Sequence, residues 1–242
     1  MFKKRIKAIW LVLLMFSVCS GEVAAASFSI NVNSKETGVL DILFLTTLLS
    51  LLPAIVLTMT CFTRIAIVFS FLRNAMGTAQ VPPTQVLMGL SLMLTVFIMT
   101  PVVKQIETQA YIPYKKGEIE QEAAIKAAAQ PLKEFMLRQT KKEDMALFMS
   151  IAKSPKIKDV KEIGIEVVIP AFIISEIKRA FVMGFCLFIP FIVIDMVVSS
   201  ILMSLGMMML PPAMISLPFK ILLFILANGW DMLVKSLVTS FR

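Results

Sequence analysis

Histidine is absent from the sequence, which removes the residue that most often acts as a general base or as a metal ligand. Cysteine is scarce as well, and three residues in 242 do not make a disulfide framework. Cys19 belongs to the leader described below, whereas Cys61 and Cys186 lie in apolar runs, where we expect small buried hydrophobic side chains. The sequence also lacks a phosphate-binding glycine loop and a nucleophile motif. We therefore expect neither catalysis nor a bound metal or cofactor.

Charged residues are also few, at 17% of the chain, whereas hydrophobic residues make up 58%. A soluble domain of this length carries about a quarter charged residues, because its surface must be hydrated. The composition therefore indicates an all-α integral membrane protein. The leader described below carries four of the 24 basic and one of the 16 acidic residues, so its removal lowers the net charge from +8 to +5, which is modest. Basic residues do not alternate with aromatic ones, so nucleic acid is not an expected partner.

Residues 1–26 have the pattern of a secretory signal peptide. The start is basic, an apolar segment covers residues 8–18, and Ala24 to Ala26 form a small-residue cleavage site. The apolar segment has about 11 residues, well short of the roughly 20 that a membrane-spanning helix needs. We expect cleavage after Ala26, and an uncleaved membrane anchor is the alternative.

Four long apolar stretches follow the leader, and each is long enough, or nearly long enough, to cross a bilayer as a helix. They cover residues 42–63, 86–103, 181–210 and 213–227. Pro211 and Pro212 separate the last two stretches, so we expect these to form a helical hairpin. The chain then divides into a first apolar hairpin (27–103), a small helical insertion facing water (104–162) and a second apolar hairpin (163–242).

The insertion differs from the apolar stretches because it holds 12 of the 24 basic residues. Residues 118–129 are rich in helix-forming side chains, and we expect Pro131 in the first turn of a helix. Thr140 and Glu143 have the spacing of a capping box ahead of an amphipathic helix. A cleaved leader and two crossings would place this basic segment outside the cytoplasm, against the positive-inside rule. A simple four-span topology is therefore disfavoured.

Several charged residues interrupt the apolar stretches or flank them: Glu166, Glu176, Lys178, Arg179, Asp195, Lys220 and Asp231. An unpaired charge at the centre of a bilayer costs about 3 kcal/mol on insertion scales, so such residues normally face protein, water or each other. One interpretation is a structural pair between Asp195 and Lys220 across the hairpin. The interpretation we favour is an oligomer around a water-filled lumen, and a proton relay through Asp195 or Glu176 is a third.

Residues 170–185 read PAFIISEIKRAFVMGF, which closely resembles the signature of the FliP family of flagellar type III export-gate proteins, whose virulence-secretion relatives are the SctR proteins. Further segments that resemble the family occur in the same order: 62–65, 71–75, 82–86, 130–140, 206–212, 217–220 and 228–230. The resemblance covers about residues 40–241. It departs at Asn228, where an acidic residue is expected, and in the short segment 27–40. The leader and segment 130–140 favour the flagellar branch over the virulence branch.

The resemblance implies a polytopic membrane protein whose helical hairpins assemble into a ring or helical oligomer. In that family, FliP-like subunits form a pentamer that combines with the membrane proteins FliQ and FliR into a helical funnel. Unfolded flagellar subunits pass through its lumen during flagellum assembly. The implied location is the cell membrane at the flagellar basal body. Hairpins that lie against other subunits, raised out of the bilayer plane, would resolve the conflict of topology.

The resemblance also implies a role for the loop before the two prolines. Met207, Met208 and Met209 match a methionine-rich loop that would form a gasket around the closed pore. A thioether side chain is apolar and flexible, so a ring of methionines could exclude ions and still deform around a passing chain. Ordinary helix packing by these methionines is the alternative.

Charged residues in the matched segments are candidates for contacts between subunits. Arg138, Glu176 and Lys220 are candidates for ion pairs across a subunit boundary, because opposite charges at low dielectric fix the register of an interface. A pair within one chain is the alternative for each. Asp195 is a candidate buried charge.

Two other classes of function compete with a pore subunit. A secondary transporter for a small solute would also place broken helices and ionisable groups within the membrane. Four candidate spans are few for such a protein, and the two hairpins share no evident repeat. A membrane-embedded enzyme is disfavoured by the absences described above. We therefore expect a structural pore subunit of the flagellar type III protein export gate.

Overall fold

The computed structural model describes residues 39–78, 81–152, 163–207 and 210–241, and the predicted leader lies outside them. This described part is helical and contains no strand. Its helices are α2 (Val39–Met59), α3 (Phe62–Met76), α4 (Thr84–Ile106), the π-helix η1 (Glu107–Tyr111), α5 (Ile112–Lys115), α6 (Gln121–Gln139), α7 (Lys142–Ile151), α8 (Ile165–Ser204), α9 (Pro212–Leu226) and α10 (Gly229–Thr239). The chain forms two compact units, residues 1–54 and 55–242, and the packing described below belongs to the second.

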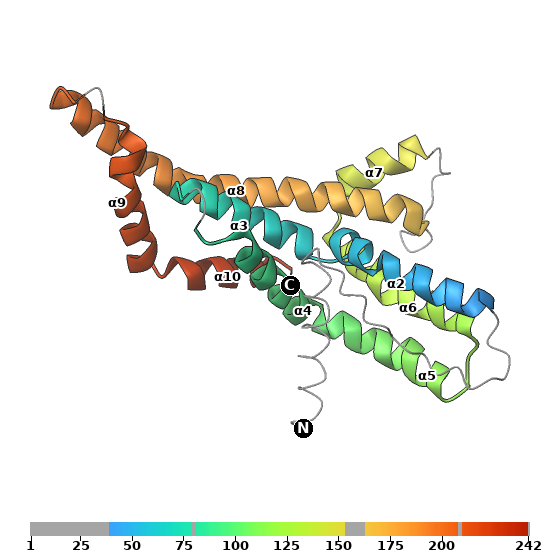
Figure 1. Cartoon of the computed structure of the whole chain (residues 1–242). Coiled ribbons are helices and arrows are strands. Elements are labelled where there is room, and N and C mark those ends of the chain that lie inside the picture. The colour runs from blue at the N-terminus through green and yellow to red at the C-terminus, as the bar shows by residue number, and fades with distance from the viewer. Residues whose placement is uncertain (1–38, 79–80, 153–162, 208–209, 242) are drawn as a thin grey trace. The chain divides into compact units, whose positions relative to one another are not determined.

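Helix α8 is the element on which the second unit is built, because α3, α6, α7 and α9 all pack against it. Figure 1 shows α3 lying along α8. Gly184 permits this close approach, since a Cβ atom at that position would lie 2.5 Å from Cγ of Phe71. The core between the two helices consists of buried apolar side chains: Ile65, Val68, Phe69, Leu72, Val168, Ala171, Phe172 and Ala180.

Helices α8 and α9 form the hairpin that the sequence predicts. Helix α8 ends at Ser204, and α9 begins at Pro212, directly after Pro211. The two helices pack against each other, with the rings of Phe191 and Phe224 at a centroid separation of 6.4 Å. The proline pair lies at the start of α9, where a missing backbone N–H costs no intrahelical hydrogen bond.

Helix α10 returns from the end of α9 toward α3. A bend of 63° separates the two helices, and Asn228 at the bend adopts a left-handed conformation with φ of 48°. The ring of Trp230 lies 5.4 Å from that of Phe224 and 6.4 Å from that of Phe69. Leu237 near the end of α10 is completely buried. The end of the chain is thereby brought back to the core.

Two helical segments of the described part are long and apolar enough to cross a membrane, Thr84–Lys115 and Ile165–Ser204. Two bent pairs would raise the number to four if each pair forms one span: Leu49–Met59 with Phe62–Met76, and Pro212–Leu226 with Gly229–Thr239. Only 17% of the apolar window of α8 is buried within the chain. Most of this surface is therefore open to lipid or to other proteins. Cys186 of α8 belongs to it, so the expectation of a buried side chain is wrong for Cys186 and is confirmed for Cys61.

Two local predictions for the insertion are wrong. Pro131 does not open a helix but lies inside α6, which begins at Gln121, because the helix-forming residues before the proline continue through it. Thr140 does not cap α7; it ends α6, and its hydroxyl donates a hydrogen bond to the carbonyl of Met136 at 2.7 Å. Helix α7 follows Lys141, whose side chain makes no capping hydrogen bond.

Candidate functional site

A buried ion pair joins α3 to α8. Nε of Arg64 donates a hydrogen bond to Oε2 of Glu176 at 2.9 Å, and Nη2 donates to Oε1. The two side chains are 1% and 0% exposed. A guanidinium that binds a carboxylate through two bonds fixes the orientation of both groups. The pair therefore defines how α3 and α8 are aligned.

Gln139 of α6 connects this pair to the C-terminal end of the chain. Its Oε1 accepts hydrogen bonds from Nη2 of Arg64 at 3.3 Å and from Nη1 of Arg179 at 3.1 Å. Its Nε2 donates to the backbone carbonyl of Phe241 at 3.1 Å. Nη1 of Arg64 donates to the backbone carbonyl of Ser240 at 3.3 Å and to its hydroxyl at 3.0 Å. One polar network thus holds α3, α6, α8 and the chain end together.

Helix α7 is attached to α8 by a second charged group. Oδ2 of Asp144 accepts a hydrogen bond from the hydroxyl of Ser175 at 2.6 Å, and Oδ1 accepts one from Lys178. Burial of the carboxylate acts to raise its pKa, but the hydrogen bonds from Lys178 and Ser175 outweigh this effect. The nearby charge of Lys141 contributes in the same direction, so the pKa of Asp144 lies below its usual value. Asp144 is therefore ionised at neutral pH.

Asp195 and Lys220 form an ion pair across the α8–α9 hairpin. Nζ of Lys220 donates to Oδ2 of Asp195 at 2.6 Å, and the hydroxyl of Ser216 donates to Oδ1 at 2.5 Å. Nζ of Lys220 also donates to the carbonyl of Ala75 in the last turn of α3 at 3.3 Å. A cation is favoured there because the C-terminal end of a helix carries partial negative charge. Lys220 therefore ties the hairpin to α3.

The tip of the hairpin is shaped by a glycine. Gly206 has a positive φ of 75°, its amide donates to the carbonyl of Met203 at 3.1 Å, and the amide of Met207 donates to that of Leu202 at 3.0 Å. This pair of hydrogen bonds is the Schellman motif, which ends α8. The motif fixes the backbone of Met207, a residue that is 45% exposed.

A cavity of about 440 Å³ lies beside the polar network, between α4, α6 and the chain end. It is lined by Ile98, Pro101, Val102, Gln105, Phe135, Arg138, Gln139 and Phe241. Arg138 is exposed and donates only a long hydrogen bond, 3.4 Å, to the carbonyl of Glu134 in its own helix. Within the described residues Arg138 has no ion-pair partner.

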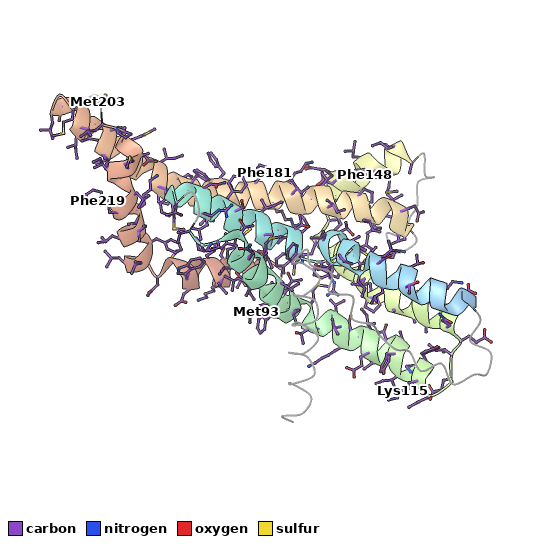
Figure 2. The ribbon with its side chains drawn as sticks, in the orientation of Figure 1. Met93, Lys115, Phe148, Phe181, Met203 and Phe219 are labelled. Carbon is purple, nitrogen blue, oxygen red and sulfur yellow. The ribbon has the colours of Figure 1, made fainter. Side chains whose placement is uncertain are left out.

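The outer surface of the hairpin is apolar. Phe181 of α8 is 54% exposed, and Phe219 of α9 is 56% exposed. Figure 2 labels both side chains, together with Met203 near the tip. No cluster of three or more metal-ligating side chains occurs in the part of the chain that the structure describes. The hairpin therefore combines internally paired charges with a surface suited to lipid or protein contacts.

Comparison with known proteins decides the family. The model of the FliP family matches residues 45–237, a range that contains the three interhelical ion pairs described above. The chain belongs to the FliP family. The resemblance noted in the sequence is thus confirmed.

Relatives with the name flagellar biosynthetic protein FliP match between 82% and 98% of this FliP-family chain. The protein of Pectobacterium carotovorum subsp. carotovorum is 53% identical over 199 residues, which are 82% of this chain and 77% of the relative. That of Bacillus subtilis (strain 168) is 50% identical over 214 residues, 88% of this chain and 97% of the relative. That of Aquifex aeolicus (strain VF5) is 45% identical over 238 residues, which are 98% of this chain and 99% of the relative.

The structure gives intrachain partners to two of the residues that the FliP resemblance singled out. Glu176 pairs with Arg64, and Lys220 pairs with Asp195, so the intrachain alternatives are observed. The prediction of a buried charge at Asp195 is wrong, because its side chain is 38% exposed, and Lys220 is the buried member of that pair. Ion pairs between FliP-family subunits stay a prediction, for which Arg138 retains an exposed guanidinium.

The predicted gasket is described only in part. Met207 lies at the exposed tip of the hairpin, as a loop residue, and Met208 and Met209 lie outside the described residues. The role of the three methionines as a FliP-type gasket therefore stays a prediction.

Sequence reasoning missed Arg64, which holds the polar network together. A signal for it exists, because this arginine interrupts an apolar stretch between Phe62 and Ile65 and lies in segment 62–65, which resembles the FliP family. Gln139 was also missed, although it lies in segment 130–140, which resembles the FliP family. An uncharged amide carries no charge signal, so its part in the network becomes visible only in three dimensions.

Proposed function

We propose that the chain is a structural pore subunit of the flagellar type III protein export gate, which conducts unfolded flagellar subunits across the cell membrane. The single observation that carries this proposal is the family match over residues 45–237, together with relatives named for flagellar biosynthesis. The chain acts in this proposal as a structural component and not as an enzyme. Its place is the cell membrane at the flagellar basal body.

The exposed apolar surface supports a role in assembly. Helix α8 leaves most of its apolar window uncovered, and α9 carries strongly exposed side chains such as Met214 and Leu226. In our proposal this surface packs against further copies of the chain, as a pentamer, and against the export-gate proteins FliQ and FliR. An exposed apolar surface of this kind marks contacts with lipid or with other proteins.

The intrachain ion pairs support the same proposal. Two pairs of charged residues inside the apolar helices, which would be costly if unpaired in lipid, are matched within the chain: Arg64 with Glu176, and Lys220 with Asp195. Neither of these ion pairs has to break before the hairpin can pack against a neighbouring subunit. The charges therefore fix the internal geometry of the subunit, and the exposed apolar faces are left for contacts with other subunits.

The loop at the tip supports the gasket. The Schellman motif at Gly206 directs the chain out of α8 and leaves Met207 exposed. In the assembled ring, Met207, Met208 and Met209 of each subunit would surround the lumen. Flexible apolar thioethers would close it to ions and yield to an exported chain.

Arg138 is the proposed contact between neighbouring subunits. Its guanidinium borders a cavity of about 440 Å³ and has no carboxylate partner among the described residues. We propose that an acidic side chain of the neighbouring subunit pairs with it. Opposite charges at such a boundary would set the register of the ring.

Secretion of flagellar subunits into the medium tests the proposed function. Cells that lack their own family member would express this chain or a variant with Met207 to Met209 deleted. We expect the intact chain to restore secretion and motility. Failure to restore them, with the chain inserted and partner proteins of its own species supplied, would contradict the export role. Solute uptake in place of secretion would favour the transporter alternative.

A further inference from the structure

The last described residues of the chain, Ser240 and Phe241, make several polar and aromatic contacts with α3 and α6. Nη1 of Arg64 donates to both the carbonyl and the hydroxyl of Ser240, and Nε2 of Gln139 donates to the carbonyl of Phe241. The guanidinium carbon of Arg64 lies 3.8 Å from the centroid of the Phe241 ring. The Phe241 ring also stacks with the ring of Phe135, at a centroid distance of 6.5 Å and an interplanar angle of 23°.

These contacts place Phe241 as part of the wall of the cavity that Arg138 borders. Helix α4 lines the same cavity through Ile98 and Val102. Chain segments that are far apart in sequence thus line one space, and the C-terminal end contributes Phe241 to it. Arg64 contributes to the position of Phe241 through the ring contact and through its hydrogen bond to the carbonyl of the preceding residue, Ser240, while Gln139 binds the carbonyl of Phe241 itself.

The surroundings of Gln139 carry a surplus of positive charge. Arg64 and Arg179 donate hydrogen bonds to its side chain, and Arg138 precedes it in the wall of the same cavity. Among the described side chains that contact this network, Glu176 supplies the one carboxylate. A cavity with this balance of charge favours an acidic group from outside. The chain itself exposes such groups, among them Glu107, Glu143 and Glu166.

We propose that the C-terminal end forms a docking wall for a second copy of this chain: Arg64 holds Ser240 and Phe241 so that Phe241 shapes the cavity in which Arg138 receives an acidic side chain of the neighbour. Arg64 and Phe241 are positioning residues in this contact, and Arg138 is the residue that binds. This inference rests on the proposed assembly of the export gate and adds the chain end to the surface between its subunits.

A double-mutant cycle tests the proposal on the full-length chain in mild detergent. Phe241→Ala, Arg138→Ala and the double variant would be compared with the unchanged chain for the fraction of subunits in oligomers at several concentrations. We expect each single substitution to weaken association by about tenfold, as for a central interface residue. We expect the double variant to be no worse than Arg138→Ala, because both changes affect one contact.

Two further variants separate this role from a general loss of structure. Phe241→Tyr keeps the ring and should assemble like the unchanged chain. Thr239→Ala removes an exposed hydroxyl that bonds only within α10, so it should also assemble normally. Helicity and thermal unfolding of dissociated Arg138→Ala, Phe241→Tyr and Thr239→Ala subunits should match those of the unchanged chain. Phe241→Ala loses the ring contacts with Arg64 and Phe135, so its association is compared at a temperature at which its dissociated subunits are still folded.

Normal assembly of Phe241→Ala would overturn the proposal. Additive losses in the double variant, or equal losses for Phe241→Ala and Phe241→Tyr, would overturn it as well, because they show that the ring does not act through Arg138. The proposed export role has a separate readout, secretion by the intact chain. A chain that secretes normally while Phe241→Ala assembles normally would refute the docking wall alone.

Discussion

The guanidinium of Arg64 and the carboxylate of Glu176, which are 112 residues apart in sequence, bind each other through two hydrogen bonds between α3 and α8. Both groups are removed from solvent. Transfer of two charges from water is costly, and the pair offsets this cost only while both partners are present. Loss of either residue therefore destabilises the fold by more than the loss of its hydrogen bonds, because the other charge stays buried without a partner.

Removal of one partner of this pair should destabilise the fold strongly. For Glu176→Ala we expect a loss of about 4 kcal/mol in the free energy of unfolding, because a buried guanidinium is left without its counter-ion. The double variant Arg64→Met with Glu176→Leu should recover part of this loss, because neither charge of the pair is left buried alone, whereas the hydrogen bonds from Arg64 to Gln139 and Ser240 are lost. Thermal and denaturant unfolding in detergent would measure both. A double variant as unstable as Glu176→Ala would contradict the electrostatic explanation.

Substitutions of Asp195 should separate the need for an acceptor from the need for a charge. Asp195→Asn keeps an oxygen that can accept from Ser216 or Lys220, whereas Asp195→Leu leaves both donors without it. We expect Asp195→Leu to lower unfolding stability by about 3 kcal/mol and Asp195→Asn by about half of that. Equal unfolding midpoints for the two variants would show that the hydrogen bonds are unimportant.

The Asp144 carboxylate should make the attachment of α7 sensitive to acid. Its pKa is lowered in the folded chain, so its contribution to stability is complete above its unfolded pKa, about 3.9, and disappears as pH falls through the lower folded value. Hydrogen exchange of the α7 amides would follow this local stability between pH 6 and about pH 2.5. In Asp144→Asn the pH dependence should be largely lost. An unchanged profile in that variant would assign the effect to another group.

Gly206 should be required for the conformation of the hairpin tip. Gly206→Ala places a side chain at a φ of 75°, which costs about 1 kcal/mol for residues other than glycine. We expect a small fall in unfolding temperature and impaired secretion, because the backbone at Met207 changes. Ser204→Ala, an exposed neighbour in the last turn of α8, is the matched control and should behave like the unchanged chain. Normal secretion by Gly206→Ala would show that the hairpin tip functions with a different backbone conformation at this position.

The sequence predicts the broad architecture well because apolar periodicity and proline act locally. The hairpin of α8 and α9 follows from two apolar runs and the break at Pro211 and Pro212. The same local reasoning failed at Pro131, where a strongly helix-forming segment continues through a proline, and at Thr140, whose hydroxyl bonds back into the preceding helix. Propensity and capping patterns are weak signals that packing overrides.

The charged network was predictable only in part because its members come together by tertiary folding. Asp195 and Lys220 lie on two adjacent apolar runs, so their pairing could be considered from the sequence. Arg64 and Glu176 lie in different parts of the chain, and no local pattern links them. The contacts of Phe241 depend on the return of α10 across the core, which the sequence does not indicate.

Ion conductance of membranes that carry the assembled complex tests the central claim most directly. The unchanged chain would be compared with a variant that lacks Met207, Met208 and Met209, after assembly of both has been verified. The export-gate account predicts a closed complex for the unchanged chain and a clear ionic leak for the deletion variant, because the apolar gasket is lost. An assembled deletion complex that conducts no more than the unchanged one would contradict it.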